Sequence, residues 1–305
     1  MLINQFLIRM TMAHQYSQEA EEIIDKQFPV LDHGFIRLVS YMGTDQRIVD
    51  AARVSYGDQE KEKSSEDNKR LIRRLMRDKH TSPFEMVTIL YHVKLPIFVA
   101  RQWIRHRTAS VNEISARYTQ LEDEFYLPRE FRMQDPNNKQ GSMVTEVSPD
   151  LKQEFLSLIL SSNEESYNSY HRLLDLGLAR EMARIPLGLG IYTEWYWQIN
   201  LHNNFNFLRL RITPDAQWEI RQYANVMGNE IVRRIAPMAY EAFEDYVLNS
   251  LTFSRMELNA LRVLMMTRNN LTLKQLKEVY GLAKAERESF PLKLERIGLE
   301  GRVMK

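Results

Sequence analysis

The sequence contains no cysteine. This absence excludes disulfide bonds, thiolate metal sites and every mechanism that uses a thiol nucleophile. It is compatible with a reducing compartment, and we expect a cytoplasmic protein. The formal net charge is only +1, so no overall electrostatic attraction to nucleic acid or to an anionic membrane is predicted.

Long hydrophobic runs are also missing. No apolar stretch approaches the roughly 20 residues that span a bilayer. The segment MLINQFLIRMTMAHQ is apolar, but Asn4, Gln5 and Arg9 interrupt it, and it has neither a basic lead nor a small-residue cleavage site. We therefore expect neither a signal peptide nor a membrane partner. The 305 residues, 44% hydrophobic and 27% charged, are typical of a globular protein of one or two domains.

Several catalytic signatures do not occur. There is no Gly-x-Gly-x-x-Gly and no phosphate loop, so a dinucleotide would not bind through a Rossmann turn. Without a Gly-x-Ser-x-Gly elbow, Ser115 is not expected to act as an esterase nucleophile. The seven histidines form neither a His-x-x-x-His nor a His-Glu-x-x-His pattern, so no metal site is predicted.

Hydrophobic periodicity predicts alternating helices and strands. Strands are expected within residues 34–43, 86–93 and 188–200. Residues 108–120 and 129–150 are expected to be loops, and 203–211 to be a short helix or irregular. In the tail, Leu258, Leu261 and Met265 share one helical face, and two more helices are expected within 272–298. The other predicted helices are 16–27, 44–56, 65–80, 97–107, 150–176, 178–186 and 214–235.

A basic cluster stands out in RQWIRHRTASVNEISARYTQ, which begins at Arg101 and contains four arginines, one histidine and a single acid. If the helix that follows Pro96 continues, Gln102, Arg105 and His106 project from one face, with Arg107 at the exit. Guanidinium groups beside small hydroxyl residues predict an anion site. A surface patch of ion pairs is the alternative, but the segment has too few acids to pair with.

A second polar group follows about ninety residues later. Polar side chains alternate there with Phe205, Phe207, Leu208 and Leu210, which predicts a groove for a planar, charged ligand such as a nucleotide. The alternative is a packed helix with ordinary amide hydrogen bonds. The polar members are Arg184, Asn200, His202, Asn206, Arg209 and Arg211.

The order Arg105-His106-Arg107, seven residues, then Ser115 resembles the signature of the flavin-dependent thymidylate synthases. The segments ARVSY, TSPFE, FVARQW, ASVNEISARY and AQWEIRQYA are similar to that family in the same order, over roughly residues 33 to 250. The resemblance implies an α/β (α+β) fold with a central mixed or antiparallel sheet flanked by helices. It also implies a homotetramer whose active sites are built from several subunits.

The resemblance further implies an enzyme that methylates dUMP to dTMP. Methylenetetrahydrofolate would supply the carbon, and FAD, reduced by NADPH, would supply a hydride. The missing cysteine agrees with this, because the unrelated folate-only thymidylate synthases need a cysteine nucleophile. Placed donors would instead polarise the uracil.

Site residues follow from the resemblance position by position. Arg211 is the expected catalytic residue, which would face the uracil and favour ionisation at N3. Ser115 would position the nucleotide, and Asn112 would lie between the two ligands. The residues expected to bind dUMP are Gln102, Arg105, Glu113, Ser115, Ala116, Arg117, Arg184 and Arg211. Those expected to bind FAD are Ser55, Ser82, Glu85, Arg105, His106, Arg107, Asn112, Glu113, Asn200, His202, Asn206 and Leu210.

Three positions depart from the family. Asp215 stands where histidine is frequent, His202 where arginine is frequent, and Ser82 where threonine is frequent. A carboxylate at Asp215 cannot donate a hydrogen bond to the flavin as an imidazole can, whereas serine keeps the hydroxyl of threonine.

The expected organisation is an N-terminal extension (1–32), a catalytic domain (33–250) and a helical C-terminal extension (251–305). A helix-turn-helix in this tail is a weak alternative, because we take its basic residues to be balanced by acids. One rival function is a nucleic-acid-binding protein that uses the Arg105–Arg117 cluster, but the net charge argues against it and no nucleic-acid partner is expected. A second rival, a relative that keeps flavin without turnover, rests only on Asp215.

Overall fold

The computed structural model describes residues 14–55, 57, 63–136, 141–143, 147–267 and 270–304. The chain forms two compact units, Met1–Leu248 and Asn249–Lys305. Within the described ranges, no helix combines the length and the hydrophobicity needed to cross a membrane.

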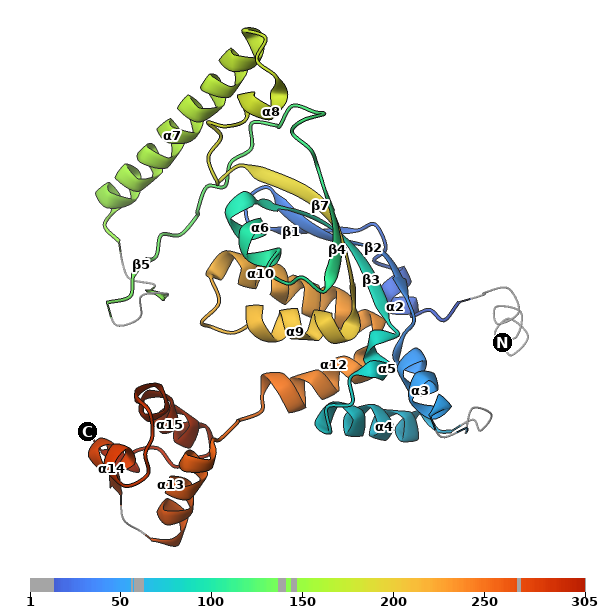
Figure 1. Cartoon of the computed structure of the whole chain (residues 1–305), viewed down its shortest axis with the longest axis vertical. Helices are drawn as coiled ribbons and strands as arrows, with labels where there is room; N and C mark the ends of the chain where they lie inside the picture. The colour runs from blue at the N-terminus through green and yellow to red at the C-terminus, as the bar shows by residue number, and fades with distance from the viewer. Residues whose placement is uncertain are drawn as a thin grey trace. The chain divides into compact units, whose positions relative to one another are not determined.

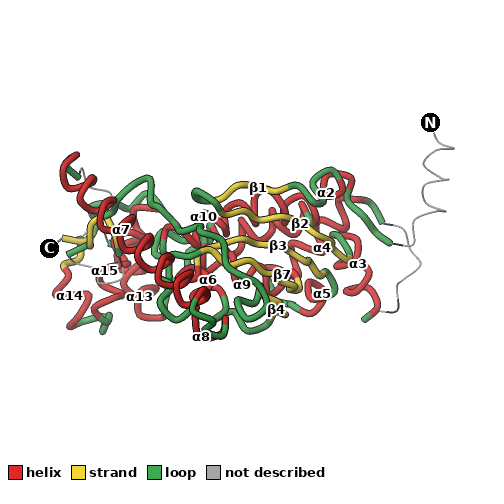
Figure 2. Tube along the Cα trace, turned by 90° about the horizontal axis from the view of Figure 1, so that it is seen from above, coloured by secondary structure: helices red, strands yellow, loops and turns green. Residues whose placement is uncertain are grey.

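The first unit is built on a five-stranded antiparallel sheet in the order β1-β2-β3-β7-β4. Figure 2 shows the strands side by side in this order. The predicted α/β fold with a central sheet is therefore confirmed, and the sheet is antiparallel. The strands are β1 (Gln27–Val30), β2 (Gly34–Met42), β3 (Thr88–Pro96), β7 (Tyr192–Asn200) and β4 (Ala109–Glu113).

Helices pack against this sheet, and α6, α9 and α10 contact its strands directly (Figure 1). The two-residue strands β5 (Met133–Gln134) and β6 (Ser142–Met143) form a separate pair. The helices are α2 (Gln18–Glu21), α3 (Asp45–Val54), α4 (Ser65–Arg77), α5 (Ser82–Glu85), α6 (Ile97–Trp103), α7 (Pro149–Asp175), α8 (Arg180–Ala183), α9 (Leu201–Arg211), α10 (Trp218–Val226), η1 (Met227–Val232), α11 (Arg233–Ile235), α12 (Pro237–Phe243) and η2 (Glu244–Leu248).

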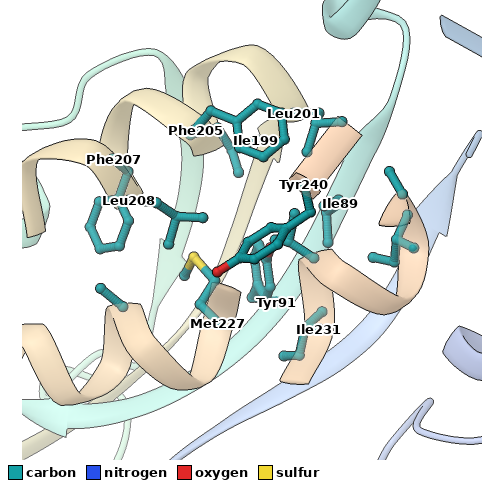
Figure 3. Close-up of a cluster of buried hydrophobic side chains, with 14 of the residues drawn as sticks. Ile89, Tyr91, Ile199, Leu201, Phe205, Phe207, Leu208, Met227, Ile231 and Tyr240 are labelled. Carbon is teal, nitrogen blue, oxygen red and sulfur yellow. The ribbon is translucent and has the colours of Figure 1, made fainter. Parts of the chain in front are cut away.

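One face of the sheet is the core. Side chains alternate along β3, so Ile89 and Tyr91 are fully buried, and Ile199 lies beside them on β7. Figure 3 shows these side chains meeting Leu208 from α9 and Tyr240 from α12. Burial of such residues supplies most of the free energy that holds the helices on the sheet.

The opposite face is polar. Arg37 donates to His92 Nδ1 at 2.7 Å, and His92 Nε2 pairs with Glu194. The His92 ring stacks on Tyr196, with centroids 4.8 Å apart. This alternation between an apolar and a polar face is typical of an antiparallel sheet that is covered on one side.

Two predicted helices are wrong in extent. Instead of a helix over 16–27, only the four-residue α2 forms, and the chain then enters β1, whose Pro29 lies on an edge strand where its missing N–H is tolerated. The helix expected over 214–235 begins at Trp218 and passes through the π-helical η1. Pro214 lies in the preceding loop.

The cluster segment also differs from the prediction. The helix after Pro96 ends at Trp103, so Arg105 and His106 do not lie on it. The expected loop after Arg107 contains β4, which pairs with the edge of β7. Its side chains are mostly exposed, so backbone pairing holds it and no hydrophobic alternation revealed it in the sequence.

The second unit has its own small core. Buried residues from three helices and the turns between them form it, and β8 (Leu271–Thr272) pairs in parallel with β9 (Val303–Met304). Leu258 and Met265 do share a face of the first helix, but that face is turned outward, with the two residues 50% and 74% exposed. The helices are α13 (Arg255–Met266), α14 (Leu273–Glu278) and α15 (Lys284–Arg296).

A buried ion pair ties α15 to α13. Lys293 Nζ lies 2.6 Å and 2.8 Å from the two carboxylate oxygens of Glu257, whose side chain is 1% exposed. The Glu257 carboxylate also accepts from the backbone N–H of Ser254. Removing that carboxylate would leave a mostly buried ammonium group without its partner.

We therefore expect Glu257→Gln to cost about 3 kcal/mol of stability within the second unit. Hydrogen exchange of the α13 and α15 amides should speed up, while β3 and β7 amides keep their protection. Glu288→Gln is the control, since its pair with Lys284 is exposed and should contribute little. Equal exchange rates in both variants would contradict this account.

Candidate active site

The centre of the predicted site is a contact between α9 and the turn after α6. Arg211 Nε donates to His106 Nε2 at 3.0 Å, and Arg211 Nη2 donates to the carbonyl oxygen of Gln102 at 3.2 Å. The structure thus brings together three residues that the sequence predicted for the site.

Packing fixes the position of this contact. Trp103, which ends α6, is fully buried and lies 4.6 Å from Phe207, measured between ring centroids. The His106 ring meets the same Phe207 edge-on at 4.8 Å. Because Phe207 and Arg211 are one helical turn apart on α9, the aromatic contact places Arg211 beside the histidine.

His106 is held in its neutral form. Burial, together with the charge of Arg211, lowers the pKa of His106 from 6.5 to about 4. A neutral imidazole that accepts at Nε2 carries its proton at Nδ1. The histidine therefore acts as an uncharged acceptor for the arginine.

Arg211 has no counter-ion among the residues that the structure describes. Burial lowers the pKa of its guanidinium below the ordinary value, although the group stays charged. Its partners in the described part of the chain are the neutral imidazole and a carbonyl oxygen, and no carboxylate there lies within ion-pair distance. The positive charge is consequently available to an anion that reaches this position.

A hydrogen-bonded chain holds Gln102 from the other side. Gln102 Nε2 bonds to Gln217 Oε1, and Gln217 Nε2 donates to Glu219 Oε2 at 2.8 Å. Glu219 is 3% exposed and also accepts from Tyr126 and pairs with Arg132. Sequence reasoning missed Gln217 and Glu219, although both lie in the quoted segment AQWEIRQYA and an acid amid its apolar residues was the available signal.

The turn after α6 also presents two unpaired cations. Arg105 and Arg107 are exposed, and neither has a hydrogen bond or ion pair to the residues that the structure describes. Beside them is a cavity of about 220 Å³, lined by His106, Arg107, Trp195 and others of β4 and β7. Free guanidinium groups next to an aromatic-lined cavity suit a planar ligand that carries phosphate.

A second group lies at the far end of β4. Arg117 Nε is 3.3 Å from Glu181 Oε2 on α8, and Arg184 Nε donates to the carbonyl oxygen of Glu181 at 3.3 Å. Ser115 Oγ accepts from the backbone N–H of Arg117, and Ala116 is buried. Arg117 and Arg184 thus share one neighbour, and Ser115 shapes the turn.

The β4 residues in the predicted site have different surroundings. Glu113 accepts from the hydroxyl of Thr193 at 2.6 Å. Asn112 pairs with Tyr196 in the sheet register and is exposed.

A third group lies along α9. Asn200 caps this helix by accepting from the N–H of Asn203, and His202, Asn206 and Leu210 follow at four-residue spacing along one side. Asn206 and Leu210 are exposed. This row has the periodicity of a surface offered to a ligand or to another chain.

The remaining predicted flavin residues lie near the start of α9. Ser82 and Glu85 belong to α5, which contacts α9 through the Phe84 and Phe205 rings. Ser55 caps the C-terminus of α3, which contacts α5. Asp215, the residue that departs from the family, is exposed in the loop after α9.

The Arg117 group and the Arg211 group have separate hydrogen-bond partners in the described part of the chain. Among the described residues, no hydrogen bond or ion pair joins the Arg117 group to the Arg211 group. Apolar side chains near both groups are left exposed, including Val111 and Ile114 at 43% and Ile185 at 74%.

Comparisons with known proteins identify the family to which the chain is similar. The family model described as "Thymidylate synthase complementing protein" matches residues 37–238. The chain is 55% identical over 241 residues to a flavin-dependent thymidylate synthase of Treponema denticola, covering 78% of this chain and 90% of that protein. It is 55% identical over 237 residues to one of Thermus thermophilus, covering 78% and 85%.

A solved structure is similar as well. It is the crystal structure of a UMP/dUMP methylase PolB from Streptomyces cacaoi bound with 5-Br dUMP. The TM-score is 0.66 at 32% sequence identity, and the match covers 72% of this chain and 98% of that one.

The lowered pKa of His106 predicts a pH dependence. The folded protein binds the His106 proton less tightly than the unfolded chain does. The contribution of the neutral imidazole to the free energy of unfolding is therefore complete above about pH 6.5 and is lost as the pH falls toward 4. The Tm of the wild type should therefore fall more between pH 7 and pH 4.5 than that of His106→Asn. His80→Asn, an exposed histidine outside the site, should follow the wild type. Parallel Tm curves for wild type and His106→Asn would contradict the neutral imidazole.

Proposed function

Because the chain belongs to the flavin-dependent thymidylate synthase family, and therefore methylates dUMP to dTMP as a flavoenzyme, we propose that Arg211 is its catalytic residue. The observation that carries this proposal is the half-buried guanidinium of Arg211, which is held by two neutral acceptors and has no carboxylate partner within the described ranges. A charge kept in this way stabilises negative charge that develops on a bound uracil.

The reaction needs a carbon and a hydride that the chain does not contain. We propose that methylenetetrahydrofolate supplies the methylene carbon and NADPH supplies the reducing equivalents. The balance is then dUMP, methylenetetrahydrofolate, NADPH and a proton giving dTMP, tetrahydrofolate and NADP⁺. FAD, when bound, supplies the hydride that completes the methyl group.

The role of Arg211 follows from its donors. A guanidinium has five N–H groups, and one goes to His106 and one to the Gln102 carbonyl. The remaining three can face the N3 and O4 edge of uracil. Stabilising the ionised ring there makes C5 nucleophilic, so that it can form the new carbon–carbon bond and then lose its proton. No protein nucleophile is needed, which suits a chain without cysteine.

Gln102 would meet the nucleotide as a hydrogen-bond acceptor. An ionised Glu219 can only accept, so the amide of Gln217 must turn its NH₂ toward it and its oxygen toward Gln102. The NH₂ group of Gln102 then donates to Gln217, and the side-chain oxygen of Gln102 stays available as a hydrogen-bond acceptor. In dUMP only N3–H and the 3′-hydroxyl can donate to that oxygen. We propose the 3′-hydroxyl as its partner, because N3 would face Arg211 in its ionised form.

The other dUMP contacts are proposed from charge and position. Arg105, Arg117 and Arg184 supply cations for the phosphate, and Ser115 and Ala116 form the turn beside it. Glu113 is an acceptor at the end of β4.

The residues proposed for FAD fit its chemistry. Arg105 and Arg107 are exposed cations for a pyrophosphate, and the neutral His106 and the aromatic-lined cavity suit a planar ring system. Asn112 and the α9 row of Asn200, His202, Asn206 and Leu210 add polar and apolar contacts. Ser55, Ser82 and Glu85 would lie at the end of this row.

We propose that copies of the chain complete the site, as a homotetramer. Among the described residues, no hydrogen bond or ion pair joins the Arg117 group to the Arg211 group, and exposed apolar residues lie near both. A partner that covers these residues would bring donors from one chain to a ligand held by another. The domain division proposed for such an assembly is an N-terminal extension (1–32), a catalytic domain (33–250) and a C-terminal extension (251–305).

The rival functions are less well supported. A nucleic-acid site at the Arg105–Arg117 cluster would not require the half-buried hydrogen bond between Arg211 and His106. A relative without turnover rested on Asp215, which is exposed and has no hydrogen bond or ion pair to Arg211 among the described residues.

Arg211→Ala tests the catalytic role. The variant should keep its flavin absorption band but lose about 10²–10³-fold or more in dTMP formation, because a charge donor to the reacting ring is gone. Arg209→Ala is the control, since it removes an equal charge two residues away, where the guanidinium is exposed and bonds to Asn206. Normal turnover by Arg211→Ala would refute the proposal.

Gln217→Met tests the orientation of Gln102. Methionine keeps the length of the side chain and leaves the Glu219–Arg132 pair intact, but Gln102 is released. The KM for dUMP should rise about tenfold, the value of one lost hydrogen bond, with kcat little changed. The same substitution at Gln222, whose amide bonds only to the Trp218 carbonyl in the described structure, should change neither value. An unchanged KM in Gln217→Met would disprove the orienting role.

A further inference from the structure

The second unit, Asn249–Lys305, lies outside the family match, which ends at residue 238. It has its own buried core, and nothing in the catalytic proposal uses it. Its charge and topology therefore call for a separate explanation.

The charge of this unit corrects our expectation from the sequence. Residues 249–305 contain eleven lysines and arginines but only six acids, a net charge of +5. Since the whole chain is +1, residues 1–248 carry −4. The tail is not balanced by acids. The near-neutral net charge of the whole chain is the sum of a basic second unit and an acidic first unit.

The order of elements is helix, strand, helix, turn, helix, strand (α13, β8, α14, α15, β9). Gly281, with φ of +68°, ends the hydrogen bonding of α14, and the N–H of Leu282 closes the end by donating to the Leu276 carbonyl at 2.9 Å. Residues 279–283 connect α14 to α15, and Ala283 is the N-cap of α15. Two contacting helices joined by a short, glycine-containing connection have the element order of a helix-turn-helix.

The core holds these helices in place. Leu282 in the turn is buried with Leu276 of α14 and with Phe290 and Leu294 of α15. The buried Glu257–Lys293 pair fixes α15 against α13. The second helix of the motif is thus rigidly positioned, as a helix that enters a DNA groove must be.

Basic side chains lie on both sides of the turn. Lys274 and Lys277 are exposed on α14, and Lys284 is exposed at the start of α15. Arg287 bonds only to the Leu282 carbonyl in the described structure, so its charge is not neutralised. Lys277 has no acidic partner among the described residues.

The acids nearby are mostly engaged. Glu286 accepts from the N–H of Ala283 at the start of α15, and Glu257 is buried on Lys293. Glu278 and Glu288 form exposed pairs with lysines four residues earlier, at 4.0 Å and 3.8 Å. Exposed pairs of this kind are weak, so phosphate groups can replace the carboxylates.

We propose that the second unit binds duplex DNA through the α14–α15 helix-turn-helix. The start of α15 enters the major groove, and Lys277 and Lys284 contact phosphates on either side. The inference does not depend on the proposed catalytic function. A protein partner on the outward face of α13 is the competing occupant of this unit.

The test is fluorescence anisotropy of the full-length protein with a labelled 30-base-pair duplex of arbitrary sequence, titrated between about 50 and 200 mM salt. Saturating dUMP is present, so that the Arg105–Arg117 cluster is occupied. The wild type should bind with a Kd that weakens steeply with salt. In Lys277→Ala/Lys284→Ala, the affinity at low salt should fall at least tenfold, and the slope of log K against log salt should fall by about two.

The matched control is Lys26→Ala/Lys152→Ala, which removes two exposed lysines of the first unit. It should bind DNA as the wild type does, and all three proteins should form dTMP at the same rate and share one Tm. Absence of binding at low salt would overturn the proposal and favour the protein partner. Equal loss in both double variants would also overturn it, because binding would then follow total charge. Since dTMP formation is measured separately, failure here leaves the catalytic proposal untouched.

Discussion

The catalytic account depends on a single arginine that is kept charged without a counter-ion. Arg211 is half-buried, and its partners in the described structure are a neutral imidazole and a carbonyl oxygen. A carboxylate in their place would lower the cost of burial but would also cancel the charge that a uracil anion needs. The lowered pKa of His106 serves the same purpose. Only the neutral imidazole can accept a hydrogen bond from the guanidinium, and a protonated imidazole could not.

The rest of the first unit positions that contact. The antiparallel sheet presents Trp195 and Trp197 to α6, and Trp103 packs against both and against Phe207. Behind it, the buried Glu219 holds Gln217 and, through it, Gln102. Each polar group is thereby oriented by a buried neighbour, which keeps the site arranged before a ligand arrives.

The sequence predicted the elements with strong periodicity, such as β3, β7 and α7, because alternation or helical spacing is visible in single residues. It did not predict β4, whose exposed side chains carry no such signal, or that α6 stops at Trp103. The residue types of the site were predicted through the family segments. The neutral partners of Arg211 and the Glu219 chain were not, because contacts between positions about a hundred residues apart leave no local pattern. The charge of the tail was wrongly predicted, because the near-neutral total combines a basic second unit with an acidic first unit.

The most direct test of the central claim compares the binding of dUMP and 5-fluoro-dUMP to the flavin-loaded protein by titration calorimetry. Fluorine is nearly the size of hydrogen but makes N3 more acidic. If the charge of Arg211 favours the ionised ring, 5-fluoro-dUMP binds more tightly, and its advantage shrinks as the pH rises and dUMP itself ionises. Equal affinities at every pH would contradict the account, since the site would then not distinguish the anion.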